Sequence, residues 1–396
     1  MKNLMRIFVA TVALFAVSCV TDTTEDVGVG LTNGGAQTTI AISLEESRTQ
    51  LGEKAGDLYP LYWSEGDQIS INGVASTALS ANEAGSAVAT FSVTGELKAP
   101  YCIAYPAANA GEVVFAAQQS YVEGTFSNGA STMYGYSENG EGISMNHLTG
   151  VLKVGVVGEH KLVLAQVSTA DRASIAGQFT LDFTTGELAA TAASKEVIEY
   201  SFGEGVQLSS EATYLHLAVP AGVYDELYVT LYDADGGVMY ATVKAGDSKP
   251  LSVGKVREFS NNIVYAPNAN VYVIRDKESL KGFAAAVNEA GSAYTTDALL
   301  VADVDMTGED WTSINWKSAS GADGAANLAT FHGNGYAIKG LNAPLFDTLT
   351  ANVKGLHLRD VNINETARPN VGSLAPRIEG WRGYRQAIDL ALLDYR

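Results

Sequence analysis

Cysteine is nearly absent from this chain of 396 residues, which has only Cys19 and Cys102. Cys19 has a separate expected role, given below, so no internal disulfide is expected. Basic residues are also scarce, because 25 Lys and Arg stand against 44 Asp and Glu, for a formal net charge of −19. A chain this acidic is repelled by nucleic acid and by anionic lipid headgroups, which argues against both as partners.

Motifs for enzymatic chemistry are also missing. The five histidines are isolated, and none has a second histidine or cysteine two to four residues away, which argues against a metal site. No phosphate-binding glycine loop, dinucleotide-binding pattern or nucleophilic serine elbow occurs. Asp303 and Asp305 lie two residues apart on a predicted strand and therefore share one face, as two glycosidase carboxylates would. Apart from that pair, the sequence predicts no cofactor and no enzyme activity.

Long hydrophobic runs are confined to the N-terminus. Residues 7–17 are apolar except for Thr11, and the positive Lys2 and Arg6 precede them. A bilayer span needs about 20 apolar residues, so this run is too short to cross a membrane. Its length is typical of a secretory signal peptide, which we predict to be residues 1–18.

The signal peptide ends in a motif that predicts a lipid anchor. Residues 16–19, Ala-Val-Ser-Cys, resemble the lipobox of bacterial lipoproteins, although Ala16 stands where that family usually has leucine. The resemblance implies acyl chains on Cys19 that hold the protein to the outer membrane. Acidic residues just after Cys19 resemble a surface-export signal of some Gram-negative lipoproteins, which implies a surface-exposed protein. Residues 19–37 have no apolar period and are predicted to be a flexible tether.

Short alternating runs rich in Val, Tyr, Thr and Leu fill the next part of the chain, separated by Gly, Asn and Asp clusters. In the run 226–232, one face carries Leu and Val while the other carries Tyr and Thr, as a strand requires. The pattern predicts an all-β protein with two consecutive Greek-key-type β-sandwiches, one over residues 38–141 and one over residues 142–266.

The pattern changes beyond residue 266. Asp276 is the expected N-cap of a helix whose apolar residues recur at helical spacing, at positions 280, 283, 284 and 287. Short strands with glycine turns follow, and their weak repetition predicts a short right-handed parallel β-helix over residues 270–376. Residues 377–396 abandon this pattern and are predicted to be an irregular tail, either a cap of the β-helix or the result of a truncation or frameshift.

Several stretches together resemble the fimbrillin family, the lipoprotein pilins and related surface proteins of Gram-negative bacteria of the gut and mouth. These stretches are residues 48–51, 63–69, 101–107, 147–154 and 175–181, together with 218–225 and 254–259. The resemblance implies two β-sandwich domains, export as a lipoprotein, and structural or adhesive work without catalysis. Residues 271–375 resemble glycine-rich β-helical repeats of surface proteins from the same bacteria, in which Asp303 and Asp305 would be turn residues. This departs from polymerising pilins and favours a tip subunit or a stand-alone adhesin.

Arg48 is a candidate site of proteolytic maturation. In polymerising members of the family a trypsin-like protease cuts after an arginine near the N-terminus, which removes the lipid and the first strand. The vacated groove then has unpaired backbone groups that accept a strand from a neighbouring subunit. The alternative is that Arg48, which follows the strand-like residues 38–44, is an exposed arginine at a strand end.

Two tryptophans, Trp316 and Trp381, are candidate contacts for a ligand, because aromatic rings stack on sugars or grip a partner. Trp63 and Trp311 occupy positions that the resemblances imply to be core. We therefore expect a fimbrial accessory or tip subunit, or an adhesin, whose partners are the membrane, other subunits by strand pairing, or a host protein or glycan. The alternatives are a surface glycan-binding lipoprotein and a glycan-degrading enzyme that uses the β-helix face.

Overall fold

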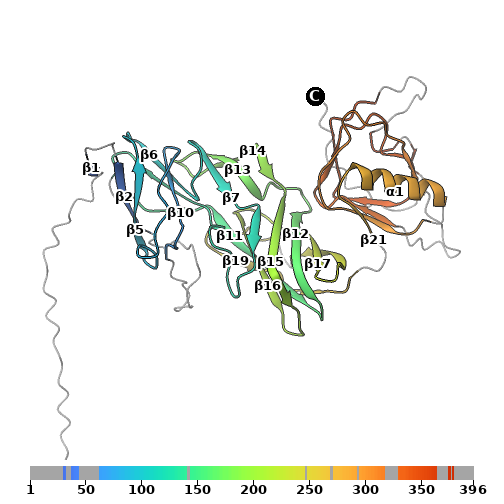
Figure 1. Cartoon of the computed structure of the whole chain (residues 1–396), viewed down its shortest axis with the longest axis horizontal. Coiled ribbons are helices and arrows are strands. Elements are labelled where there is room, and N and C mark those ends of the chain that lie inside the picture. Colours follow the sequence, from blue (N-terminus) through green and yellow to red (C-terminus); the bar gives the residue numbers. More distant parts are fainter. Residues whose placement is uncertain are drawn as a thin grey trace, which may run out of the picture.

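The structure is a computed structural model of the chain. It describes residues 30–32, 37–43, 62–140, 143–245, 248–267, 271–291, 294–316, 329–363, 373–375 and 377–378. Among these residues the only α-helix is α1 (Lys277–Ala290), and all other regular elements are strands (Figure 1). The all-β class is therefore confirmed. In the part of the chain that the structure describes, no helix is long and apolar enough to cross a membrane.

The first group of strands packs two sheets around one core. The three-stranded sheet has the order β1-β2-β5, and the five-stranded sheet has the order β10-β9-β6-β3-β4. The strands are β1 (Gly30–Thr32), β2 (Gln37–Ser43), β3 (Ser70–Ile71), β4 (Val74–Ala75), β5 (Val88–Thr94), β6 (Tyr101–Tyr105), β9 (Met133–Ser137) and β10 (Asn146–His147). Trp63 lies in the core between the sheets, where its ring centroid is 4.9 Å from that of Phe91 and 5.4 Å from that of Tyr105. Its core position agrees with the expectation from sequence.

The second group has a larger core between two main sheets. One sheet has the order β16-β11-β19, with β20 also paired to β11, and the other has the order β18-β17-β12-β15-β8. The strands are β8 (Gln118–Ser120), β11 (Thr149–Val157), β12 (Lys161–Thr169), β15 (Val197–Gln207), β16 (Thr213–Pro220), β17 (Glu226–Asp233), β18 (Val238–Lys244), β19 (Val256–Glu258) and β20 (Ile263–Val264). Both sheets contribute residues to the buried cluster, which includes Leu152, Leu215, Val167 and Val229.

A smaller antiparallel sheet, β14-β13-β7, links the first two groups. Its strands are β7 (Glu112–Phe115), β13 (Ala176–Leu181) and β14 (Leu188–Lys195). Strand β7 pairs with β13, and β8 pairs in parallel with β15, so strands that precede residue 142 join sheets built by later residues. The division into domains 38–141 and 142–266 stays a prediction. Strands β7 and β8 lie before this boundary and pair with strands that lie after it.

The third group consists of α1 and three parallel sheets, with the orders β21-β22-β25-β28, β23-β26-β29 and β24-β27-β30. The strands are β21 (Val271–Ile274), β22 (Asp297–Leu300), β23 (Val304–Asp305), β24 (Ile314–Trp316), β25 (Thr330–His332), β26 (Ala337–Lys339), β27 (Phe346–Leu349), β28 (Asn352–Lys354), β29 (His357–Arg359) and β30 (Arg377–Ile378). From β25 onward each strand pairs with the strand three elements earlier, so successive turns of the chain lie on one another.

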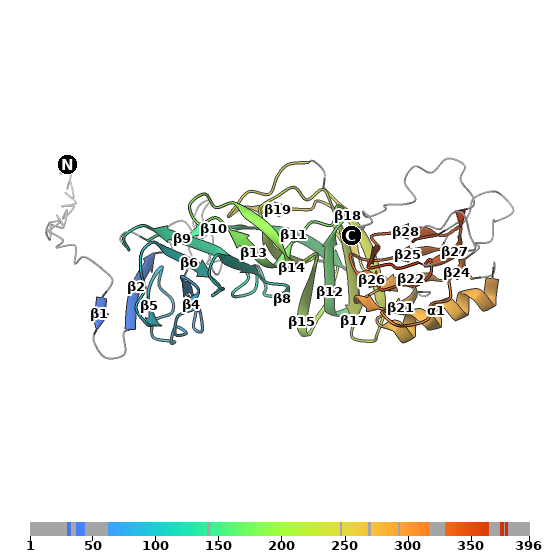
Figure 2. The same cartoon turned by 90° about the horizontal axis from the view of Figure 1, so that it is seen from above.

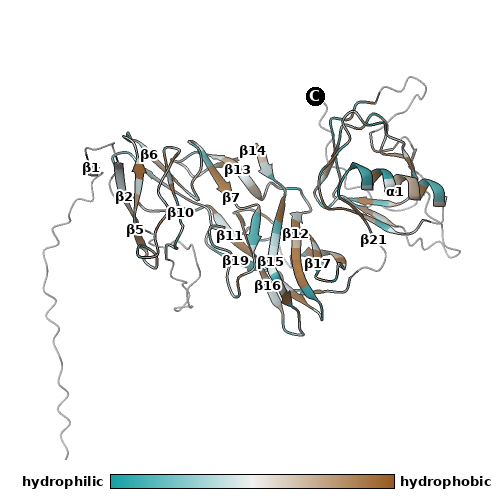
Figure 3. Cartoon of the chain, in the orientation of Figure 1, coloured by the Kyte–Doolittle hydropathy of each residue, from teal (hydrophilic) through white to brown (hydrophobic). Residues whose placement is uncertain are grey.

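Helix α1 begins and packs as the sequence predicts. The Asp276 carboxylate accepts a hydrogen bond from the Ser279 backbone N–H, and the Ser279 hydroxyl accepts one from the Asp276 backbone N–H. These two hydrogen bonds form a capping box. The buried residues of the helix are Leu280, Phe283, Ala284 and Val287. They join a core formed with the parallel sheets, whereas the visible face of the helix is largely hydrophilic (Figure 3).

The three groups follow one another along the long axis of the molecule. Strands β1, β2 and β5 lie at one end, the second group lies in the middle, and the parallel sheets with α1 lie at the other end (Figures 1 and 2). The order in space is therefore the order in sequence. The junction between the second and third groups holds the site described next.

Candidate functional site

The site begins with the outward face of the sheet β18-β17-β12-β15-β8. Strand β17 buries Leu227, Val229 and Leu231 in the core of the second group, so Tyr228 and Tyr232 point outward, as its period of two predicts. The same alternation turns Gln166 and Ser168 of β12 and Tyr240 of β18 outward. This face of polar and aromatic side chains is the surface on which the third group packs.

Hydrogen bonds to Gln166 join the two groups. The Gln166 amide donates to the Val301 carbonyl at 3.2 Å and to the Tyr336 hydroxyl at 2.8 Å, both in the third group. Its amide oxygen accepts a hydrogen bond from the Tyr232 hydroxyl at 2.6 Å. One glutamine therefore bonds to both sides of the junction, which fixes its rotamer and that of Tyr336.

A second contact lies between β18 and the first parallel sheet. The Tyr240 hydroxyl donates to the Asp297 carboxylate, and the Tyr240 ring centroid lies 3.6 Å from that of His332. Burial lowers the pKa of His332 to about 3, with a smaller contribution from the nearby Lys354 ammonium. The imidazole is therefore neutral at physiological pH and packs as an aromatic ring.

Two glycines allow the groups to approach closely. Gly335 has a φ of +79°, and a Cβ there would lie 3.0 Å from Ser168 Cβ. Gly355 has a φ of +56°, and its Cβ would lie 3.2 Å from the Tyr228 ring. A side chain at either position would strain the backbone and also push the second and third groups apart.

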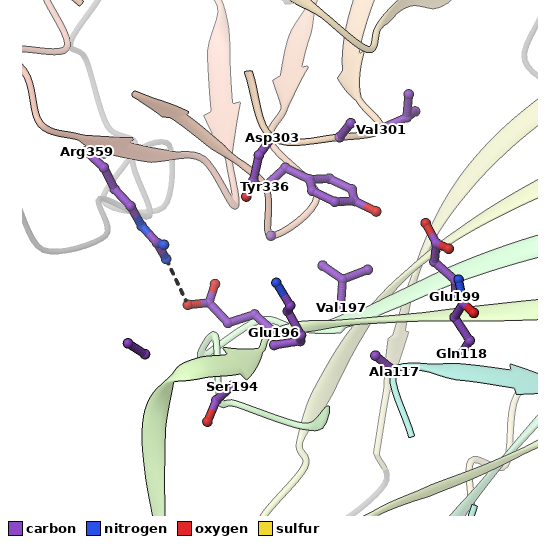
Figure 4. A pocket seen from close by; sticks show the side chains of 14 residues that line it. Ala117, Gln118, Ser194, Glu196, Val197, Glu199, Val301, Asp303, Tyr336 and Arg359 are labelled. Atoms are coloured by element: carbon purple, nitrogen blue, oxygen red, sulfur yellow. Dashed lines mark hydrogen bonds and ion pairs between the residues drawn. The ribbon is translucent and has the colours of Figure 1, made fainter. Parts of the chain in front are cut away.

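A cavity of about 360 Å³ lies beside this contact. Its wall comes from three parts of the chain (Figure 4). Ala117, Gln118, Glu196, Val197 and Glu199 lie in or next to the strands of the second group, Ala192, Ser194 and Lys195 lie on β14 of the linking sheet, and Val301, Ala302, Asp303, Gly335, Tyr336 and Arg359 belong to the third group. We call it the junction cavity. Its size falls at the lower end of the roughly 300–1,000 Å³ typical of small-molecule sites.

Glu196 is the acid of the junction cavity that contacts two basic side chains of the third group. It lies where the chain passes from β14 to β15, and its carboxylate lies 3.3 Å from Arg359 Nη2 and 2.6 Å from His357 Nε2. Burial raises the pKa of Glu196, the positive charges of Arg172 and Arg359 oppose that rise, and the Asp303 carboxylate adds to it. This ion cluster connects the second and third groups on the side opposite to Tyr240 and forms one wall of the cavity.

The two aspartates singled out in the sequence both make contacts within the third group, and that of Asp305 is a local turn contact. Asp303 accepts a hydrogen bond from the Ala337 backbone N–H at 2.8 Å. Asp305 accepts one from the Thr307 N–H at 2.9 Å and pairs with Lys339 Nζ at 3.1 Å. Hydrogen bonds from Thr307 and the pairing with Lys339 lower the pKa of Asp305 to about 2. Only Asp303 lines the junction cavity.

Other polar side chains of the junction cavity are not used by the fold. Gln118 and Glu199 are directly opposite each other on β8 and β15, and both are exposed. Within the described residues, neither of these side chains nor that of Lys195 makes a hydrogen bond or ion pair with the protein. These groups are free to bind a molecule in the cavity.

The prediction that Trp316 contacts a ligand is wrong. Its side chain is completely buried in the third core, where its ring centroid lies 5.1 Å from that of Phe283 and 6.3 Å from that of Phe346. A large aromatic ring gains most by burial, and the helix supplies the surface that covers it. Trp311 is also buried, as expected. Cys19, Arg48 and Trp381 lie outside the described residues.

Sequence reasoning did not find the junction cavity. Its walls come from segments separated by more than a hundred residues, as the contact between Glu196 and Arg359 illustrates. The one local signal was a glutamate between two strand-like runs, which is also common at exposed turns. No group of three or more His, Cys, Asp or Glu in the part of the chain that the structure describes could hold a metal ion.

Comparisons with known proteins give partial matches. Residues 325–382 match the family model of the N-terminal region of M26 IgA1-specific metallo-endopeptidases, and no curated protein matches the chain. A protein from Bacteroides ovatus assigned to cell adhesion has 11% identity and a TM-score of 0.31, over 51% of this chain and 84% of that one. A fimbrial assembly protein from Parabacteroides distasonis has 9% identity and a TM-score of 0.19, over 51% of this chain and 97% of that one. These TM-scores are too low to establish a shared fold.

Proposed function

We propose that the chain is a non-enzymatic cell-surface attachment protein of the fimbrillin type, held to the outer membrane by acyl chains on Cys19. The observation that carries the proposal is the serial order of the three groups along the long axis (Figure 2). With the anchor at the N-terminal end, the third group is the part farthest from the membrane. That arrangement suits a subunit that presents a binding body to the surroundings.

The proposal includes a more specific fold. The first two groups would be Greek-key β-sandwiches, and the third a short right-handed parallel β-helix. Pairs of sheets around each of the first two cores support the sandwiches, and the parallel pairing of β25 to β30 with earlier strands supports the β-helix. Such a β-helix at the far end favours a tip or accessory subunit over a shaft subunit.

Strand pairing with other subunits is the alternative to a permanent lipid anchor, because it requires cleavage after Arg48. Strand β2 pairs with β5 over seven residues and buries Ile40 and Ile42 in the first core. Cleavage after Arg48 would remove β2 together with the lipid and leave the edge of β5 unpaired. A strand from a neighbouring subunit could then occupy the place of β2. Without cleavage, Cys19 remains the permanent anchor.

The second candidate function is glycan binding at the cell surface, and the junction cavity is the observation that favours it. Glycan degradation has less support, because a glycosidase needs one carboxyl group that is protonated near neutral pH. With a pKa of about 2, Asp305 is ionised there, and it pairs with Lys339 and does not line the junction cavity, so it is not that group. The Asp303 carboxylate already accepts a hydrogen bond from the Ala337 backbone N–H.

Replacing Cys19 by alanine tests the anchor. The wild-type protein should incorporate labelled palmitate, fractionate with the outer membrane and be degraded when intact cells are treated with protease. The Cys19→Ala protein should lose the label and leave the membrane fraction, because each lost acyl chain removes about 0.8 kcal/mol per buried methylene. A matched Cys102→Ala variant should keep both properties. Wild-type protein without palmitate, or protected from protease in intact cells, would contradict the proposal.

A further inference from the structure

We propose that the junction cavity binds the end of an uncharged oligosaccharide. The inference rests on the proposed attachment function and names the chemistry that the attachment would recognise. It is carried by the mixture of groups in the cavity wall, by side chains there that the fold leaves unused, and by the fixed placement of the wall. None of these depends on the identity of the host surface.

The charges of the wall select against a strongly ionic ligand. Three carboxylates (Glu196, Glu199 and Asp303) and two cations (Lys195 and Arg359) line the same space. An anionic ligand meets the carboxylates, and a cationic ligand meets the guanidinium and the ammonium. A sugar hydroxyl both donates and accepts hydrogen bonds, so neighbouring hydroxyls can bind to groups of both signs at once.

Unused groups provide these hydrogen bonds. Glu199 offers two acceptor oxygens, the Gln118 amide offers a donor and an acceptor, and Lys195 offers donors. Gln118 and Glu199 are register partners on β8 and β15, so they project side by side from one face of the sheet. Two planar polar groups side by side suit a pair of neighbouring hydroxyls on one sugar ring.

The wall also has an apolar part. The Tyr336 ring projects into the cavity between Asp303 and Glu199, and Val197 and Val301 lie near it (Figure 4). Sugars have C–H faces that pack on aromatic rings, while their hydroxyls point outward to polar groups. Ring, carboxylates and amide therefore complement both sides of a pyranose.

The cavity is held in shape by the junction. Gln166 fixes the Tyr336 hydroxyl at 2.8 Å, and the Glu196 carboxylate holds Arg359 at 3.3 Å. Gly335 permits the close approach of the two groups beside the cavity. Because these contacts exist before a ligand binds, the side chains lose little conformational entropy on binding.

The test uses the full folded chain without its signal peptide on an array of neutral, N-acetylated and sialylated oligosaccharides. The sugar bound best is then titrated by calorimetry. We expect neutral glycans to bind and sialylated ones to bind more weakly. The double variant Gln118→Ala with Glu199→Ala should lose affinity by about tenfold or more, the effect of losing one or two hydrogen bonds. Neither side chain supports the fold, so its melting temperature should not change.

Glu204→Ala is the matched control, because Glu204 is exposed on the same strand β15 but does not line the cavity. It should bind as the wild type does. Binding to no glycan on the array, preference for sialylated glycans, or equal affinity of the double variant would overturn the inference. If the array is negative and deletion of the gene still abolishes attachment of the bacterium, the proposed function stands and only the cavity inference fails. Release of shortened glycan from the array would replace binding by catalysis.

Discussion

At the residue scale, Glu309 is the clearest case of charges that stabilise one element. Its carboxylate lies 2.5 Å from Lys277 Nζ and 2.6 Å from Lys281 Nζ, which are four residues apart and so on one side of α1. These two hydrogen bonds and charges lower the pKa of Glu309 from 4.5 to about 2. These two ion pairs connect the first turns of the helix to the loop that follows β23.

The Glu309→Gln variant should change how stability depends on pH. Because the folded pKa lies below the unfolded pKa, ionised Glu309 adds stability above pH 4.5, and this addition is lost as pH falls toward about 2. The melting temperatures of wild type and variant should therefore differ most above pH 4.5 and converge near pH 2, with a smaller difference at high salt. Glu289→Gln, at the far end of α1, is the control. A constant difference across this pH range would contradict the account.

At this scale, the sequence predicts features that depend on neighbouring residues, and it does not predict contacts between residues far apart in the chain. Asp276 was identified as a helix cap because a cap depends on residues within one turn. Trp316 was misread as a ligand contact because its burial depends on Phe283 and Phe346, which other elements supply. The contact between Glu196 and Arg359 could not be predicted, since it joins residues far apart in sequence.

At the element scale, strand β2 completes the first core. It alternates as a half-buried strand should, with Ile40 and Ile42 inward and Thr39 and Ala41 partly exposed. Its partner β5 places Phe91 and Val93 in the same core. Loss of β2 would expose these side chains and the unpaired backbone of β5.

A chain shortened to begin at Thr49, the product expected from cleavage after Arg48, should be destabilised. The loss of unfolding free energy should exceed the roughly 2–5 kcal/mol of a single buried Ile→Ala change, because two isoleucines and a row of backbone hydrogen bonds are lost. A synthetic peptide of residues 37–43 should restore stability in denaturant titrations. The same peptide with Ile42→Asp should not. Equal stability of the shortened and full chains, or equal rescue by both peptides, would show that β2 is not a structural part of the first core.

Element type was predictable where the pattern was local. The faces of β17 and the buried side of α1 match the sequence periodicity, because each is set by the rise and turn of one element. The pairing of β7 with β13 and of β8 with β15 was not foreseen. The alternation of side chains along a strand does not indicate which distant strand it pairs with.

At the scale of the whole molecule, the polar junction explains how the second and third groups form one body. Gln166 and Tyr240 on one sheet face, and Glu196 between β14 and β15, bind the third group to the second at separate points. A body joined at several points resists bending better than one joined by a linker alone. Such a body holds the third group at a fixed distance from the second, which suits the proposed attachment function.

Attachment itself is the most direct test of the central proposal. Cells of the bacterium that carries this chain should be compared with a strain lacking the gene for adherence to mucin-coated and epithelial surfaces. We expect adherence to fall severalfold on deletion, to return with the wild-type gene, and not to return with the Cys19→Ala gene, because that protein leaves the membrane. Equal adherence of the deletion and wild-type strains on every surface would contradict an attachment function.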